Sequence, residues 1–187
     1  MTNHVTTRCL VRGSSAEVAA FRALMVEDPP LREPPIAGLL ARLCALVGRA
    51  APEPRPPPPS TFDFNRILPM PGTLADGPER AAWALDHWGT QRNADAYDEL
   101  GRSDDGAGGA MLEFVLATAW SFPAPVFEAL HRRFPALRFD VVGFEEAWHF
   151  AVEGVYGPGE TGAVEIDPTA DLYIRVYGVP PEPDEEA

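Results

Sequence analysis

The sequence has few features of secreted, metal-binding or membrane-spanning proteins. It contains two cysteines, Cys9 and Cys44, and neither belongs to a C-x-x-C pair or lies near a histidine pair. We therefore expect two separate, reduced thiols and neither a disulfide framework nor a zinc site. No apolar run reaches the ~18 residues of a membrane helix, and the N-terminus lacks the basic and apolar segments of a signal peptide. These absences predict a cytoplasmic protein that does not contact the membrane.

Basic residues are scarce. The chain has 15 Lys and Arg against 28 Asp and Glu, which gives a formal net charge of -13. This charge opposes contact with phosphate backbones or anionic lipid, so we expect no direct nucleic-acid binding. Part of the acidic excess lies in residues 179–187, which have the composition of a disordered acidic tail.

No catalytic or ligand-binding motif is complete. Ser121 stands in Ala-Trp-Ser-Phe-Pro, which lacks the glycines of a nucleophile elbow, and we expect it to cap a helix. The acidic segment around residue 104 lacks the ligand spacing of an EF-hand, and the glycines of residues 106–109 lack the lysine of a phosphate loop. The histidines are too scattered for metal-ligand pairs: His4, His87, His131 and His149. We predict no catalytic residue, no metal site and no cofactor.

The most informative stretch is residues 111–157, which predicts strand, helix, strand and strand. Over residues 111–120 the apolar side chains alternate and place Leu112, Leu116 and Trp120 on one side. Pro123 and Pro125 suit the first turn of a helix that Pro135 stops. Alternation returns in residues 137–141, Gly143 predicts a turn, and residues 150–157 predict the last strand.

The first third of the chain predicts one strand and two helices. In residues 4–11, Val5, Thr7, Cys9 and Val11 form one side of a strand, and Ser14 or Ser15 can cap the helix that follows. Residues 36–49 have a second amphipathic pattern, and the proline-rich segment after it predicts a stiff linker.

The middle of the chain predicts a short edge strand at residues 62–65 and then a helix. The helix begins with a capping box of Asp76 and Glu79, carries Trp83 and Trp88 towards the core, and ends at Gly89. Residues 93–109 have the composition of an acidic, glycine-rich loop. Residues 168–177 fit a strand or a helix, and the Asp-Pro start favours a helix.

Several segments resemble the YubB-like family of plasmid- and phage-borne proteins. The resemblance rests on "TAWSFPAPVFEALHRRFPALRF", "FDFNRILPMP", "HWGT" and "NHV". It implies a ferredoxin-like domain and a mobile-element setting, but no catalytic residues, because none are established for the family. The family commonly reads Asn-Trp-Gly-Thr-Lys-Trp, whereas here His87 precedes Trp88-Gly89-Thr90 and Gln91-Arg92 follows. A role of the missing Asn, Lys and Trp does not transfer.

Together these patterns predict one α+β domain over residues 1–178. Its core is a ferredoxin-like β-α-β-β-α-β unit, an antiparallel sheet with helices on one face. Residues 29–60 would insert a helix and a linker, and residues 72–109 the tryptophan helix and the acidic loop.

For function, we expect a non-catalytic binding or protein-interaction module of a mobile element, with an unknown protein partner. One alternative is an enzyme of unassigned type, although Glu145, Glu146 and Glu153 beside the last hairpin have the pattern of solvated carboxylates. Another is an acidic decoy that mimics DNA and occupies a host protein's DNA-binding surface. The decoy would place carboxylates along one surface: Asp95, Asp98, Glu99, Asp104 and Asp105. The oligomeric state is left open.

The candidate binding surface combines two junctions between elements. Trp88-Gly89-Thr90 ends a helix and Trp120-Ser121 follows a strand, so both place an aromatic residue at an element's end. If the junctions meet, His87, Thr90 and Ser121 would add polar groups to an aromatic pocket. The alternative, which we favour, is that both tryptophans plug the end of the core.

Overall fold

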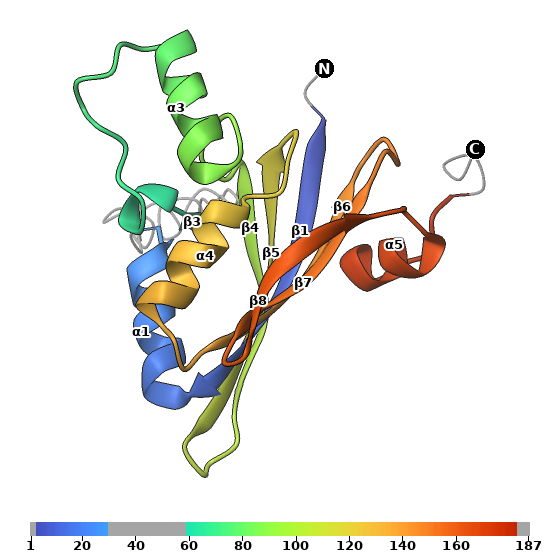
Figure 1. Ribbon diagram of the computed structural model, residues 1–187. Coiled ribbons are helices and arrows are strands. Elements are labelled where there is room, and N and C mark those ends of the chain that lie inside the picture. The colour runs from blue at the N-terminus through green and yellow to red at the C-terminus, as the bar shows by residue number, and fades with distance from the viewer. Residues whose placement is uncertain (1–2, 30–58, 183–187) are drawn as a thin grey trace, which may run out of the picture.

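The computed structural model describes residues 3–29 and 59–182. The segment predicted to form an inserted helix and a linker, which includes Cys44, and most of the predicted acidic tail lie outside these ranges. The described residues form an α+β structure with a six-stranded antiparallel sheet, four α-helices and a two-stranded sheet (Figure 1). The strands of the large sheet are, in order across it, β4 (Ala96–Asp104), β5 (Gly109–Ala119), β1 (His4–Ser14), β6 (Arg138–Glu145), β7 (Ala151–Gly157) and β8 (Glu160–Ile166).

Strand β1 lies near the middle of the sheet, antiparallel to β5 on one side and to β6 on the other. The predicted alternation is confirmed, because Val5, Thr7, Cys9 and Val11 are all buried. Cys9 is a free thiol, and burial raises its pKa well above the ordinary value. The core therefore lies on the face of the sheet to which these odd-numbered residues point.

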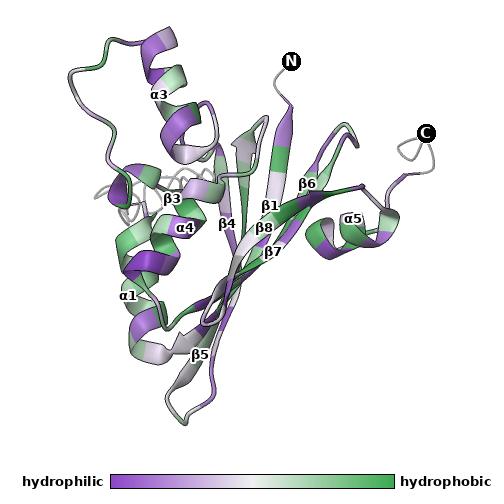
Figure 2. Cartoon of the chain, in the orientation of Figure 1, coloured by the Kyte–Doolittle hydropathy of each residue, from purple (hydrophilic) through white to green (hydrophobic). Residues whose placement is uncertain are grey.

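Helices α1 (Ser15–Met25) and α4 (Ala124–Arg133) cover that face. Ser14 caps α1 as predicted, because its side chain accepts the Glu17 N–H. Phe21 of α1 lies at the centre of the core, with ring centroids 5.4 Å from Phe139 and 6.2 Å from Phe114. Figure 2 shows that α1 carries both hydrophobic and hydrophilic residues, as a helix packed on a sheet requires.

The segment after α1 differs from its prediction. The edge strand expected at residues 62–65 is only β3 (Thr61–Phe62), which pairs with β2 (Val26–Glu27). The chain then turns into a 3-10 helix, η1 (Phe64–Arg66), because the Asp63 side chain accepts the Asn65 N–H. Helix α3 (Pro78–Trp88) ends at Gly89 as predicted, but Gly77, rather than Asp76, is its N-cap.

The acidic, glycine-rich loop predicted for residues 93–109 is wrong, because most of it forms strand β4. β4 pairs with β5, with a bulge between Glu99 and Gly101. Only Tyr97 of β4 is buried. Residues 105–108 form the hairpin turn, where the Asp105 side chain accepts the N–H groups of Ala107 and Gly109.

The turn predicted at Gly143 is also wrong, because this glycine lies inside β6. A Cβ there would lie 3.4 Å from Thr7 Oγ1 and from Val152 Cβ, which is a close but ordinary contact, so side chains of the neighbouring strands surround this position. The last predicted strand is confirmed as β7. Strand β8 follows it and forms the second edge of the sheet.

Residues Ala170–Tyr177 form helix α5, which confirms the helix favoured by the Asp-Pro start. Its buried residues, Leu172 and Val176, pack with Phe144 and Ala151 in a second small cluster. Phe144 and Val142 alternate with the core residues of β6, so this cluster lies on the opposite face of the sheet (Figure 1). The expectation that helices cover only one face of the sheet is therefore wrong, because α5 covers part of the opposite face.

Candidate functional site

The two predicted junctions meet at one end of the sheet. Ser121 Oγ donates a hydrogen bond to the Gly89 carbonyl oxygen at 2.5 Å, and Thr90 Oγ1 donates to the Ala119 carbonyl oxygen at 2.7 Å. Thr90 is fully buried. Gly89 has φ 77°, and a Cβ there would lie 2.8 Å from Pro125 Cδ. A residue without a side chain thus allows the end of α3 to approach the start of α4.

Two of the five candidate residues belong to the packing of α3. Trp88 is only 2% exposed, and its Nε1–H donates to the Leu68 carbonyl oxygen at 2.8 Å. His87 is exposed, but its ring stacks on Trp83 at 4.2 Å between centroids, and its Nδ1 bonds to the Trp83 carbonyl oxygen. Trp88 is therefore a core residue, as the alternative interpretation of the tryptophans predicts.

Ser121 and Thr90 join the two junctions through hydrogen bonds to backbone carbonyl groups. The predicted cap role of Ser121 is wrong, because the N-cap of α4 is Pro123 and has no side-chain hydrogen bond. Ser121 instead bonds Gly89 through its hydroxyl and accepts a hydrogen bond from Thr118 at its carbonyl oxygen. Both hydroxyls are therefore engaged with backbone carbonyl groups.

Trp120 is the exception, because 44% of its surface is exposed. Its backbone has φ 69°, and the Ser121 N–H donates to the Ala119 carbonyl oxygen at 2.9 Å across it. This hydrogen bond between residues two apart forms a γ-turn centred on Trp120. The Trp120 N–H donates to the Asn3 carbonyl oxygen at 2.9 Å and fixes the turn against the start of β1.

Positive φ is unfavourable for a bulky residue, by about 1–2 kcal/mol. Within residues 3–29 and 59–182, only two non-glycine residues have it, Trp120 and Trp148. Trp148 is held by packing, since its ring stacks on Tyr173 at 5.5 Å and meets Phe144 edge-on at 4.8 Å. No aromatic ring among the described residues packs on Trp120 in this way. Core packing therefore accounts for the strain at Trp148 and not for that at Trp120.

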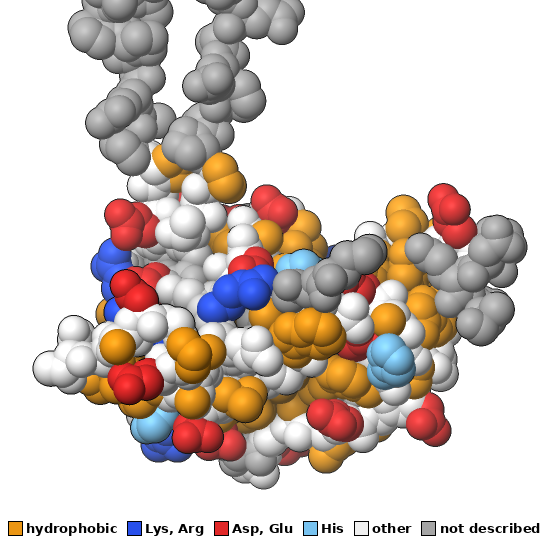
Figure 3. Space-filling view, turned by 90° about the horizontal axis from the view of Figure 1, so that it is seen from above, with side chains coloured by type: hydrophobic (Ala, Val, Ile, Leu, Met, Phe, Trp, Pro, Cys, Tyr) orange, Lys and Arg blue, Asp and Glu red, His pale blue; other side chains and the backbone are white. Residues whose placement is uncertain are grey.

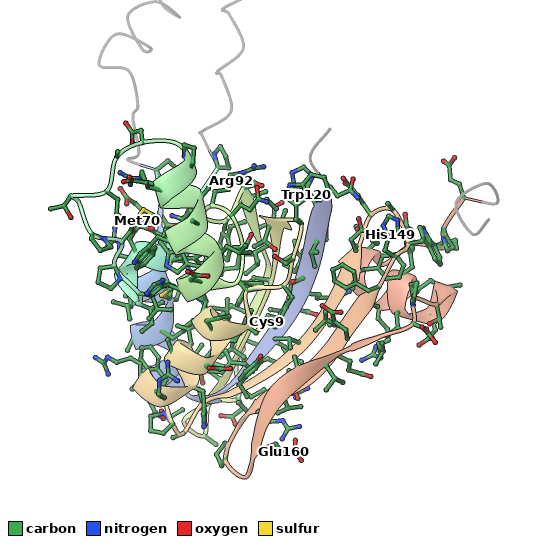
Figure 4. The ribbon with its side chains drawn as sticks, turned by 45° about the horizontal axis from the view of Figure 1, so that its top comes forward. Cys9, Met70, Arg92, Trp120, His149 and Glu160 are labelled. Atoms are coloured by element: carbon green, nitrogen blue, oxygen red, sulfur yellow. The ribbon has the colours of Figure 1, made fainter. Side chains whose placement is uncertain are left out.

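Charged and imidazole side chains surround this end of the sheet. His4 lies between two carboxylates, with Nε2 3.5 Å from Asp95 Oδ2 and Nδ1 3.5 Å from Glu146 Oε1. Arg92 binds Asp95 through two hydrogen bonds of 2.6 and 2.8 Å, and these bonds raise the pKa of Arg92. Arg92 and Trp120 lie along the same end of the molecule (Figure 4).

A buried carboxylate supports the turn between β6 and β7. Glu145 is 2% exposed, and its Oε1 accepts a 2.7 Å hydrogen bond from Asn3 Nδ2. Its Oε2 accepts from the N–H groups of Ala147 and His149 and from His149 Nδ1 at 3.0 Å. An ionised carboxylate can only accept, so Nδ1 of the exposed His149 ring donates in this hydrogen bond. The sequence indicated Glu145 only as one of three solvated hairpin acids, and its burial corrects that.

The five carboxylates of the decoy alternative lie on β4 and at its two ends. Four of them contact groups of this chain: Asp95 binds Arg92, Glu99 binds Arg22, Asp104 binds Ser15, and Asp105 binds its own turn. Asp98 has no hydrogen bond or ion pair among the described residues. Four of the five carboxylates are therefore engaged by groups of the same chain.

In the described part of the chain, no group of three His, Cys, Asp or Glu side chains could hold a metal ion. None of the described helices has the length and apolar character that crossing a membrane requires. From above, the end of the sheet shows hydrophobic, acidic and histidine side chains side by side (Figure 3).

Comparison of the chain with known protein families, with curated proteins and with solved structures gave no match. The resemblance to the YubB-like family therefore rests on the segments quoted above.

Proposed function

We propose that this protein is a non-catalytic interaction module that binds a protein partner through Trp120. The observation that carries the proposal is the conformation of this residue, which combines φ 69° with 44% exposure. Backbone strain without compensating packing concentrates at functional sites. Tryptophan is also among the residues enriched in the energetic centres of protein interfaces.

The surroundings of Trp120 suit a docking surface better than a catalytic site. The hydroxyls of Thr90 and Ser121 are engaged with carbonyl groups, so they hold the γ-turn in place and do not act as nucleophiles. The carbonyl oxygen of Asn3, the residue before β1, accepts the Trp120 N–H and fixes the same turn. The tryptophan is thus preorganised, which lowers the entropy lost when a partner covers it.

The wider setting is part of the same proposal. The strand order β4-β5-β1-β6, with α1 and α4 on one face, supports assignment of the core to a ferredoxin-like topology. The quoted sequence segments support membership of the YubB-like family and a role in a mobile element. The net charge of -13 favours a protein partner over nucleic acid.

A second candidate function, an enzymatic one, is favoured by the pair of Glu145 and His149. A buried carboxylate that orients an exposed imidazole is one part of a general-base arrangement. If the protein is an enzyme that acts on its captured partner, the mass of the partner should change, and His149→Ala should abolish that change. The docking proposal expects no altered mass.

Affinity capture from a cell lysate with three forms of the protein tests the proposal. The forms are the wild type, Trp120→Ser and a control, Leu85→Ser. Leu85 is also a half-exposed apolar residue, but it lies on α3. We expect the wild type and the control to enrich the same partner by quantitative mass spectrometry, and Trp120→Ser to lose it while remaining folded. Equal enrichment by Trp120→Ser and the wild type would contradict the proposal.

A further inference from the structure

Strand β8 forms an edge of the large sheet and pairs with β7 alone. We propose that β8 accepts an extended, basic segment of a partner protein as an additional strand. An edge strand presents unpaired N–H and C=O groups along one side, and extended peptides bind such edges through main-chain hydrogen bonds. The proposal is independent of Trp120, because β1, β6 and β7 separate β8 from β5.

The two edges of the sheet differ in how they are protected. β4 has a bulge between Glu99 and Gly101, β3 lies against it, and Glu99 is bound to Arg22 at 2.6 Å. β8 keeps a continuous register with β7 over its seven residues and has no bulge. Neither β4 nor β8 contains lysine or proline, so the bulge and the contact with β3 are what distinguish the two edges. β8 is therefore the edge that is open to another strand.

An apolar side chain on β8 is left uncovered. Val164 is 65% exposed, the largest exposed fraction among the large hydrophobic residues that the structure describes. A strand added to β8 would place a side chain about 5 Å from Val164 on the same face. An apolar residue of the partner at this position would remove both surfaces from water.

The charge near β8 selects a basic partner. Glu165 and Asp167 are exposed and make no ion pair with any described residue, whereas Arg138 lies 3.3 Å from Glu160. Both unpaired carboxylates line a shallow hollow of about 510 Å³ with His149, Phe150 and Ile166. Since neighbouring residues of a strand point to opposite faces, a segment that alternates Lys or Arg with apolar residues fits both Glu165 and Val164.

A fluorescein-labelled peptide of four Lys-Val repeats serves as the probe, with fluorescence anisotropy as the readout. A second peptide carries proline in place of two central valines, which keeps the charge but removes strand pairing. The protein variants are Val164→Lys and the matched control Leu100→Lys, which alters a half-exposed residue on the β4 edge. Both positions are exposed, so we expect both variants to keep the wild-type melting temperature within a few degrees.

The wild type and Leu100→Lys should bind the Lys-Val peptide equally, while Val164→Lys should weaken binding roughly tenfold or more. The proline peptide should bind the wild type roughly tenfold more weakly. Equal binding of the two peptides would overturn the proposal, since attraction would then be by charge alone. Equal losses in both variants would overturn it as well. A wild-type dimer in sedimentation velocity that Val164→Lys converts to monomer would show that a second copy occupies β8, and would also overturn it.

Discussion

Trp120 gives the sharpest test of the strain described above. Trp120→Ala and Trp120→Gly both remove the indole ring and therefore lose the same packing. They differ in that alanine keeps a Cβ at φ 69°, whereas glycine adopts this conformation without steric penalty. The comparison of the two variants isolates the backbone from the side chain.

The expected difference follows from two opposing terms. A Cβ at left-handed φ costs about 1–2 kcal/mol. Glycine loses more backbone entropy on folding, which costs about 0.5–1 kcal/mol relative to alanine. Trp120→Gly should therefore be more stable than Trp120→Ala by roughly 0.5–1 kcal/mol. For a chain of this size, that difference raises the melting temperature by roughly 1–4 °C.

Thermal and urea unfolding followed by circular dichroism measure the difference. Ala82→Gly at an exposed position of α3 is the control, where ordinary helical φ should make glycine less stable than alanine by about 1 kcal/mol. Glycine is thus expected to stabilise at Trp120 and to destabilise at Ala82, each relative to alanine. If Trp120→Ala proved the more stable of its pair, the strain attributed to this residue would be refuted.

Three further predictions concern the junction and the core. Ser121→Ala should lower the free energy of unfolding by about 1 kcal/mol, because it removes the hydrogen bond to Gly89. His87→Ala alters an exposed residue and should change the free energy of unfolding by less than about 0.5 kcal/mol. Equal effects of the two substitutions in urea unfolding would argue against a structural role of the Ser121 hydroxyl. Burial raises the pKa of Tyr156 to about 12, so the unfolded chain releases this proton first and stability should fall by roughly 2 kcal/mol from pH 10 to 12. Tyr156→Phe should show a weaker pH dependence, and an unchanged one would contradict the burial argument. Phe21→Ala should lower stability by about 3–5 kcal/mol in the same assay, and a loss below 1 kcal/mol would contradict its central place in the core.

Sequence alone predicted the elements whose apolar residues repeat with a clear period. Strand β5, helix α4 and strand β7 have such patterns, and prolines mark the ends of the helix. Strand β4 has no comparable pattern, because it is exposed at every residue except Tyr97. Its conformation depends on the ladder to β5, which a local reading of composition does not include. The turn predicted at Gly143 has the same cause. The neighbours of this glycine, Thr7 and Val152, lie on other strands, and a local reading of the sequence does not include them.

The candidate site was predicted only in part. Sequence placed aromatic residues at the ends of two elements, and side-chain bonds to backbone carbonyl groups hold these ends together. The alternation of β5 predicted that Trp120 continues the buried side begun by Leu112. The γ-turn after Ala119 reverses this expectation, because one residue with positive φ ends the period-two pattern. The role of Asn3 depends on contacts between distant parts of the chain.

The central claim is that a partner covers Trp120 while the buried tryptophan of α3 stays in the core. Protein labelled with 5-fluorotryptophan allows ¹⁹F NMR to follow each indole, and Trp120→Phe identifies the resonance of Trp120. When the captured partner is added, we expect the Trp120 resonance to shift or broaden and that of Trp88, which is 2% exposed, to stay unchanged. A partner that binds and leaves the Trp120 resonance unchanged would contradict the account.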